Sequence, residues 1–265
     1  MTIRFERELS EHRRDWEELA RLDPYWAILT HPERRHGRWA VDEFFLTGEA
    51  EARRVLDRAA SLGLPRTFGR LLDVGCGLGR VTRGFAPHFV ECHGCDISAA
   101  MIDGARTLNR DLVNCRFTLV SGRDLGAFES ASFDMVYCRF VLQHLPGGQA
   151  IRDSIVELVR VLAVDGLLVF QLPSELSLVR RLQPRRRLYG LLRRLGVDPG
   201  FAYRRLGLQP IRTSFLPVRE VREIVARAGA DLLRVEPDSV GGRGIASRVY
   251  LATKATRIIQ AAGSG

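Results

Sequence analysis

Residues 71–80 read LLDVGCGLGR, an apolar run that ends in an acid and is followed by three glycines at alternate positions. A glycine-rich turn between a strand and a helix directs backbone N–H groups and the positive end of the helix dipole at whatever binds there. A dinucleotide fingerprint, G-x-G-x-x-G, would need glycine where Arg80 stands. The charge of Asp73 would also oppose a pyrophosphate. The turn therefore favours a ligand with a positive group, such as an amino-acid ammonium.

From residue 70 onward, short apolar segments alternate with segments of helical periodicity. Strand, helix and strand at this spacing are typical of a parallel sheet that helices cover on both faces. The segment GLLVFQL at 166–172 lacks polar alternation, which indicates a central strand buried on both sides. The expected strands are 70–74, 89–95, 116–120, 133–138, 166–172, 231–236 and 247–253, and the helices among them are 79–86, 98–110, 148–162 and 218–229.

Five parts are expected along the chain. Helical periodicity at 4–22 and 48–62 predicts a helical cover before the sheet begins. A stretch after the fifth strand interrupts the alternation and predicts a helical insert that acts as a lid on an acceptor site. The parts are an N-terminal helical cap (1–66), the sheet core (67–173), the arginine-rich lid (174–212), the C-terminal part of the sheet (213–256) and a tail expected to be disordered (257–265).

The cysteines indicate packing in a reducing compartment. CHGC at 92–95 lies in an expected strand, where residues three apart point to opposite faces, roughly 10 Å from each other, too far for a disulfide. No second CxxC or nearby pair of histidines completes a zinc site, so no metal is expected. The charged first twenty residues lack a secretory signal, and no run of 18 apolar residues exists. A cytoplasmic location is expected.

The net charge of +9 is concentrated in one segment. Nine arginines and one acid, Asp198, lie between Arg180 and Arg205, a local charge of +8. This patch could recognise an anionic or polyhydroxylated acceptor, rest on an anionic membrane, or bind RNA phosphates. A solvated outer face of the lid is the alternative. All four interpretations stay open, as does a homodimer.

The glycine motif and three downstream segments resemble the class I S-adenosylmethionine-dependent methyltransferases, in their small-molecule branch. Asp96 ends the second expected strand, where the family has an acid that binds both ribose hydroxyls. SGRDL at 121–125 stands at the third strand end, and SFDMVYCRFVLQHLP at 132–146 is similar to motif IV and its following loop. The match covers residues 68–172. It implies a doubly wound, mostly parallel seven-stranded sheet of Rossmann-like type, with S-adenosylmethionine as cofactor and S-adenosylhomocysteine as product.

The resemblance also implies a set of cofactor-binding residues. Ser121 replaces the family's acid at the adenine amine, so Gly122, Arg123 or Asp124 could act there instead. Trp39 and Phe44 are expected to close the cofactor side and exclude water, with simple aromatic packing between helix and sheet as the equal alternative. The remaining expected contacts are Asp73, Gly75, Cys76, Gly77, Gly79, Arg80, Asp96, Ile97 and Cys138.

Methyl transfer from a sulfonium is an in-line displacement that needs alignment and, for a hydroxyl acceptor, removal of a proton. The loop after the fourth strand enters the cleft at the carboxyl ends of the sheet. There His144, with an ordinary pKa near neutral, is the candidate base, and a structural hydrogen bond within the loop is the alternative. Arg139 and Gln143 are expected to contact the acceptor. Other candidate bases are Asp124, Glu43 and Asp42.

These observations predict an O-methyltransferase that acts on a hydroxyl of a small polar acceptor, preferably a saccharide or a glycosylated natural-product precursor. Relatives that methylate nucleobase amines commonly carry Asn/Asp-Pro-Pro-aromatic where this chain has CRFV at 138–141, which disfavours a nucleic-acid base. Three alternatives remain. They are an RNA-binding methyltransferase that uses the arginine patch, an N- or C-methyltransferase of a small metabolite, and a module that binds the cofactor without turnover.

Overall fold

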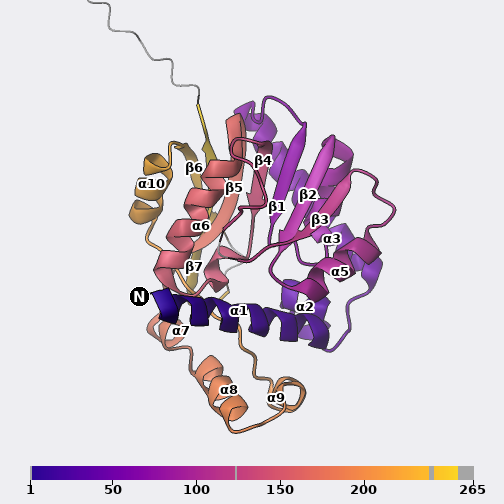
Figure 1. The fold of residues 1–265 in the computed structure, drawn as a ribbon, viewed down its shortest axis with the longest axis vertical. Coiled ribbons are helices and arrows are strands. Elements are labelled where there is room, and N and C mark those ends of the chain that lie inside the picture. The colour runs from indigo at the N-terminus through magenta and orange to yellow at the C-terminus, as the bar shows by residue number, and fades with distance from the viewer. Residues whose placement is uncertain (1, 123, 239–241, 256–265) are drawn as a thin grey trace, which may run out of the picture.

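A seven-stranded sheet with helices on both faces forms the centre of the molecule (Figure 1). The computed structural model describes residues 2–122, 124–238 and 242–255, so the expectations for Arg123 and the tail 257–265 lie outside the described residues. The strand order is β3-β2-β1-β4-β5-β7-β6. The strands are β1 (Arg70–Val74), β2 (Glu91–Asp96), β3 (Cys115–Leu119), β4 (Phe133–Cys138), β5 (Leu162–Leu176), β6 (Asp231–Asp238) and β7 (Ile245–Thr253).

Strands β1 to β5 pair in parallel, while β7 is antiparallel to both of its neighbours. The predicted doubly wound, mostly parallel fold is therefore confirmed. Strands β1 and β4 have the predicted ends, whereas β5 is longer than predicted because its pairing with β7 continues past Pro173 to Leu176. The carboxyl ends of β1, β2 and β4 meet at one edge of the sheet.

Two helical layers bury the two faces of the sheet. Helices α3 (Val41–Leu62) and α4 (Arg80–Phe85) pack on one face, and α6 (Gly147–Val161) and α10 (Val218–Arg227) pack on the other. Cys92 lies in the first layer and Cys95 in the second, which confirms that they point to opposite faces. Both thiols are free. Within the described ranges, no group of three or more His, Cys, Asp or Glu could hold a metal ion.

Helix α1 (Thr2–Leu22) runs across the carboxyl edge of the sheet (Figure 1). Its Glu17 accepts hydrogen bonds from the Ser98 hydroxyl (2.7 Å) and the Ala100 N–H (3.2 Å) at the start of α5 (Ala99–Leu108). A carboxylate is favourable there because the helix N-terminus carries a partial positive charge. Helix α1, the short α2 (Pro24–Ile28) and α3 are the helices of the N-terminal cover, residues 1–66.

The predicted helical insert consists of α7 (Leu178–Leu182), α8 (Pro184–Arg194) and α9 (Pro199–Leu206), which extend beyond α1 as an arm (Figure 1). Gln183 has a left-handed backbone, φ 47°, and separates α7 from α8. Arg193 anchors α8 to α1 through Asp15 (3.0 Å) and Glu18 (2.6 Å). No helix in the described part of the chain is long and apolar enough to cross a bilayer.

Helices α3 and α4 cross in close contact because glycines stand at the crossing. A Cβ added to Gly48 would overlap the backbone carbonyl of Arg80, and a Cβ on Gly84 would lie 2.8 Å from the carbonyl oxygen of Gly48. Backbone atoms cannot move aside as a flexible side chain can. The start of α3 was predicted at residue 48, but the helix begins at Val41 and includes Gly48, because the glycine serves this contact and does not mark an end.

Gly48→Ala is therefore expected to destabilise the protein by about 2 kcal/mol, the usual cost of overpacking. Urea-induced unfolding followed by circular dichroism measures the change. Gly190→Ala is the matched control, since Gly190 lies within α8 with nothing within 4 Å of the added Cβ, and should leave stability unchanged or raise it by up to about 1 kcal/mol. Equal effects of the two substitutions would contradict the close crossing.

Candidate functional site

A cavity of about 650 Å³ opens at the carboxyl edge of the sheet, beneath α1. The glycine loop after β1, the end of β2 and the loop after β4 form one part of its lining, and residues of α1, α2 and the segment after α9 form another. This is the place where ligands bind in doubly wound folds.

The glycine loop is shaped by close contacts on both sides. Gly75 and Gly77 have positive φ angles of 75° and 54°. A Cβ on Gly75 would overlap the side chain of Val141, and one on Gly77 would come within 2.6 Å of Ile28 Cδ1. Both the backbone conformation and the lack of space therefore exclude any residue larger than glycine at these two positions. Gly75, Cys76 and Gly77 line the cavity, and their N–H groups are bonded to the Cys95 carbonyl and to Asp96.

Asp96, at the end of β2, fixes the loop from the other side. Its Oδ2 accepts from the Gly77 N–H (3.0 Å), and its Oδ1 accepts from the Ser98 N–H (2.9 Å). Burial raises the pKa of this carboxyl above its ordinary value. Ile97 and Gly122 lie next to each other beside it, since a Cβ on Gly122 would approach Ile97 Cγ2 to 2.8 Å. An acid that can accept two hydroxyls thus lies next to Ile97 and Gly122 in the cavity lining.

Asp73 lies at the base of the loop and lines the cavity. The Thr82 hydroxyl donates to its Oδ2 (2.6 Å). Burial raises the pKa of Asp73 to about 7, and the Thr82 hydrogen bond opposes that rise. A buried acid of this kind gains a favourable interaction when a cation binds next to it.

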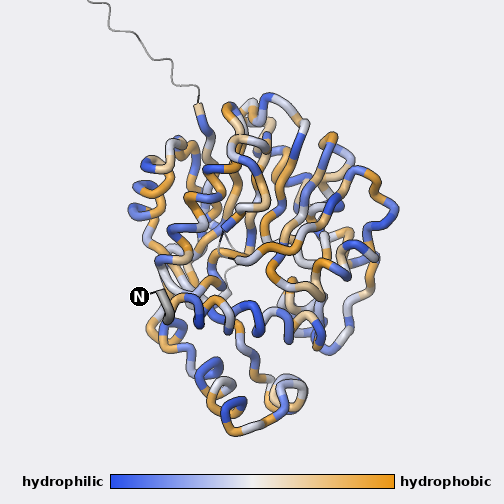
Figure 2. Tube along the Cα trace, in the orientation of Figure 1, coloured by the Kyte–Doolittle hydropathy of each residue, from blue (hydrophilic) through white to orange (hydrophobic). Residues whose placement is uncertain are grey.

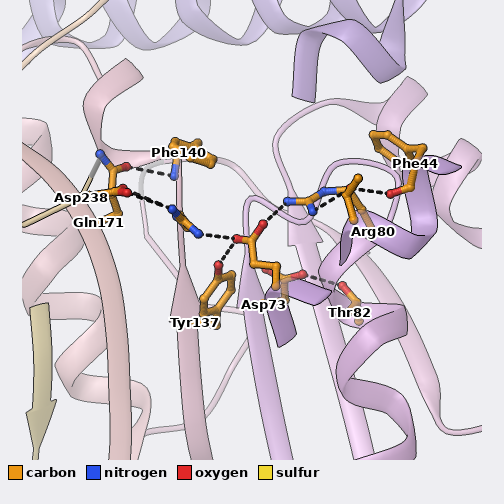
Figure 3. A network of polar contacts seen from close by, with 11 residues as sticks. Phe44, Asp73, Arg80, Thr82, Tyr137, Phe140, Gln171 and Asp238 are labelled. Carbon is orange, nitrogen blue, oxygen red and sulfur yellow. Dashed lines mark hydrogen bonds and ion pairs between the residues drawn. The ribbon is translucent and has the colours of Figure 1, made fainter. Parts of the chain in front are cut away.

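A buried network of charges forms the floor of the cavity (Figure 3). Glu51 of α3 accepts hydrogen bonds from Arg80 (2.6 Å), Arg139 (3.2 Å) and the Tyr137 hydroxyl. Arg139 also donates to Asp238 at the end of β6 (3.1 Å). Burial alone would raise the pKa of Glu51, but the two guanidinium groups hold it below its ordinary value. The positive charges of Arg80 and Arg139 are therefore already neutralised.

His144 lies in the short helix η3 (Leu142–His144) and lines the cavity. Its Nδ1 lies 2.6 Å from the carbonyl oxygen of Arg212, so Nδ1 carries the proton and donates. Its Nε2 then accepts from the side-chain amide of Gln143 (3.0 Å). Burial lowers the pKa of His144 to about 4. The edge of Trp16 from α1 contacts the ring, with centroids 5.2 Å apart. The imidazole is neutral and can accept a proton at Nε2.

A family model for a methyltransferase domain matches residues 72–170. The uncharacterized methyltransferase YcgJ of Bacillus subtilis (strain 168) is 32% identical over 103 residues, 38% of this chain and 39% of that protein. The ubiquinone biosynthesis O-methyltransferase of Azoarcus sp. (strain BH72) is 33% identical over 82 residues, 31% of this chain and 35% of that protein. The chain spans less than half the length of these curated relatives.

A solved structure gives the same fold over most of the chain. Magnesium protoporphyrin IX methyltransferase (ChlM) from Synechocystis PCC 6803 with bound SAH has a TM-score of 0.56 at 19% identity, covering 87% of this chain and 93% of that chain. Residues 72–170 form a class I methyltransferase domain. The methyl donor of this family is S-adenosylmethionine. The family and the cofactor inferred from the motifs are therefore confirmed.

The residues of the methyltransferase domain fit this cofactor. Asp96 can accept both ribose hydroxyls, Ile97 offers an apolar surface to adenine, and Asp73 can face the ammonium. Gly75 and Gly77 allow Val141 and Ile28 to pack closely against the loop, which brings these two side chains into the lining of the same cavity.

The N-terminal cover contributes different aromatic residues from those predicted. Trp39 and Phe44 do not line the cavity, but pack in an apolar cluster with Phe45 and Met101, which lies between helices and not between helix and sheet. Trp16 lines the cavity in their place, together with His12, Ile28, Leu29, Thr30 and Pro32. The helical pattern of residues 4–22 predicted α1, but did not show which of its faces meets the sheet edge.

Several other residues expected to bind the cofactor face elsewhere. Cys138 is fully buried in the core and does not line the cavity, because strand alternation points its side chain into the α6 layer. Gly79 instead serves packing, since a Cβ there would meet Asn109 and Phe117. Ser121 is exposed and outside the lining, while Cys76 and Arg80 line the cavity as predicted.

The structure places some of the candidate bases and acceptor contacts in the cavity and others outside it. Asp124, Arg139 and Gln143 line the cavity. Glu43 is paired with Arg34, and neither Glu43 nor Asp42 lines the cavity. His144 bonds Gln143 within its own loop and also the Arg212 carbonyl, which lies in the segment after α9.

Asp96→Asn is expected to weaken binding of S-adenosylhomocysteine by roughly 10- to 100-fold, because a charged acceptor of two hydrogen bonds is lost. Isothermal titration calorimetry measures the affinity. Asp103→Asn on the exposed side of α5 removes the same charge from an Arg106 pair and should leave affinity unchanged. Unaltered binding by Asp96→Asn would show that this acid does not touch the cofactor.

The affinity for S-adenosylhomocysteine should also depend on pH through Asp73. Because its pKa is about 7 and only the ionised form attracts an ammonium, affinity should rise roughly eightfold from about pH 6 to about pH 7.5. Asp73→Asn should bind weakly with no such slope. Thr82→Val removes the hydrogen bond that lowers this pKa and should move the rise to higher pH. A flat profile in the wild type would contradict the assignment.

Proposed function

We propose that this chain transfers the methyl group of S-adenosylmethionine to a hydroxyl oxygen of a small polar acceptor. The observation that carries the proposal is His144, a neutral imidazole in the same cavity as the glycine loop, with Nδ1–H committed to the Arg212 carbonyl. That bond fixes the tautomer and leaves Nε2 as the proton acceptor.

His144 acts as general base in this mechanism. The cofactor supplies an electrophilic methyl group. As the new bond to oxygen forms, the hydroxyl proton becomes strongly acidic, so an imidazole accepts it at Nε2 even with a pKa of about 4. In the structure, the Gln143 side-chain amide donates to Nε2. The acceptor hydroxyl displaces this amide and donates to Nε2 in its place. Gln171 retains Gln143 through the Gln143 side-chain oxygen (3.2 Å), so the displaced amide remains nearby.

Oxygen is favoured over nitrogen or carbon as the methyl acceptor for two reasons. A positioned base is most useful for a hydroxyl, since an amine attacks once it is neutral. The Azoarcus relative bears the name of an O-methyltransferase, which supports the same chemistry here. The proposed acceptor is saccharide-like, and the proposed location of the protein is the cytoplasm. The five free cysteines fit a reducing compartment.

The proposal is tested with labelled S-adenosylmethionine and a panel of acceptors that includes phenols, saccharides, carboxylic acids, amines and RNA. Labelled ethers or esters and stoichiometric S-adenosylhomocysteine are the expected products. Transfer to amines or RNA alone would overturn O-methylation. Binding of the cofactor with no transfer to any acceptor class would favour the module without turnover.

His144→Asn is expected to lower kcat by roughly 100-fold or more while leaving the affinity for S-adenosylhomocysteine within about twofold. Asparagine retains an N–H for the Arg212 carbonyl but has no nitrogen that accepts a proton. The wild-type kcat should show no titration of His144 between pH 6 and pH 8, because the pKa lies near 4. His88→Asn on an exposed turn is the control. A kcat that survives the change would remove His144 from catalysis.

A further inference from the structure

The arm formed by α7, α8 and α9 (178–206) carries an unusual share of exposed apolar side chains. Eight of the 17 large apolar side chains that are strongly exposed among the described residues lie on it. Orange segments alternate with blue ones along the arm in Figure 2. The eight are Leu178, Val179, Leu182, Leu188, Leu191, Leu195, Phe201 and Leu206.

Helix α8 shows that this exposure is not a by-product of packing. Its inner face packs on α1, where the buried Tyr189 donates to Glu18 and Arg193 is paired with Asp15. Its outer face presents a stripe at spacings of three and four residues, Leu188, Leu191 and Leu195, which are 47%, 54% and 71% exposed. A second covering layer would be needed to bury that stripe.

The same arm carries the positive charge of the protein. Nine arginines and one acid give it +8 of the total +9. Several of them, such as Arg180 and Arg185, donate to the backbone carbonyls of Arg243 and Gly207, which bring no formal negative charge. Arg187 and Arg194 flank the leucine stripe of α8 and are exposed. The surface therefore offers leucines and guanidinium groups side by side.

We propose that this arm docks on an anionic lipid bilayer surface. Leucines in the interfacial plane enter between the headgroups while arginines contact lipid phosphates, the combination that holds amphipathic helices at membranes. A second copy of the chain would cover the leucines, but the charge of +8 on its own arm would repel the charge of +8 on this one. RNA phosphates would engage the arginines but gain little from the leucines.

The position of the arm gives this docking a consequence for the cavity. Arg180 of α7 lines the cavity together with Gly242 and Ile245, so the cavity opens next to the arm. A docked molecule would hold that rim close to the bilayer. The proposal does not depend on which atom accepts the methyl group.

Co-sedimentation with vesicles tests the docking, using phosphatidylcholine alone and phosphatidylcholine mixed with phosphatidylglycerol. The wild type should sediment with the mixed vesicles and not with the neutral ones, and added salt should reduce binding. Leu191→Ser with Leu195→Ser, and separately Arg187→Gln with Arg194→Gln, should each weaken binding roughly tenfold or more. Affinity for S-adenosylhomocysteine should stay unchanged and shows that each variant is folded.

Val113→Ser with Arg110→Gln is the matched control, because Val113 is 98% exposed and Arg110 is also exposed, far from the arm in sequence. This pair should bind vesicles as the wild type does. A wild type that ignores anionic vesicles would overturn the proposal, as would undiminished binding by the leucine variant. If gel filtration shows that the wild type is a dimer and the leucine variant a monomer, the surface would be assigned to a second copy of the chain. Tighter binding to RNA than to vesicles would assign it to nucleic acid.

Discussion

The buried carboxylate of Glu51 connects the parts of the chain that build the cavity. It joins α3 of the N-terminal cover to Arg80 at the start of α4 and to Tyr137 and Arg139 at the end of β4, while Arg139 extends the network to Asp238. A buried ion pair offsets its desolvation only when its remaining hydrogen bonds are made, and here three donors meet one carboxylate. The glycine loop and the loop that carries His144 are thereby held at a fixed separation.

This network also decides which ligand the cavity can accept. Arg80 and Arg139 would suit phosphate groups, but carboxylates already occupy them. Asp73 and Asp96 lie beside the glycine loop. The hydrogen bonds that they accept come from Thr82, Gly77 and Ser98 and not from a guanidinium group. The floor of the cavity therefore opposes a pyrophosphate and suits an aminoacyl sulfonium with a ribose. The same loop geometry with other neighbours would serve a dinucleotide.

Local signals in the sequence predicted the elements, and the elements placed the loop. Gly75 and Gly77 adopt the left-handed backbone that glycine favours, and short apolar segments predicted β1 and β4, so these features could be read from neighbouring residues. Asp134, near the start of β4, accepts a hydrogen bond from the Arg70 N–H (2.7 Å) at the start of β1. Glu51 and Asp238 could not be found this way, because their partners lie far away along the chain and a single acid in the sequence looks like any solvated charge.

The aromatic residues show the same limit. Trp39 and Trp16 both stand in helical or turn segments of the cover, and only the path of α1 across the sheet edge decides that Trp16 meets His144. The Arg212 carbonyl that sets the tautomer of His144 is equally remote in sequence. Motifs thus identify the chemistry of a site, while long-range packing selects its acceptor side.

The most direct measurement is calorimetric titration of the wild-type protein with S-adenosylhomocysteine and, separately, with NADH. Asp73 and Asp96 beside the glycine loop predict saturable binding of S-adenosylhomocysteine with one molecule per chain and no heat from NADH. Saturation with NADH and none with S-adenosylhomocysteine would contradict the central claim that the carboxylates around the glycine loop select a nucleoside that carries an amino-acid ammonium.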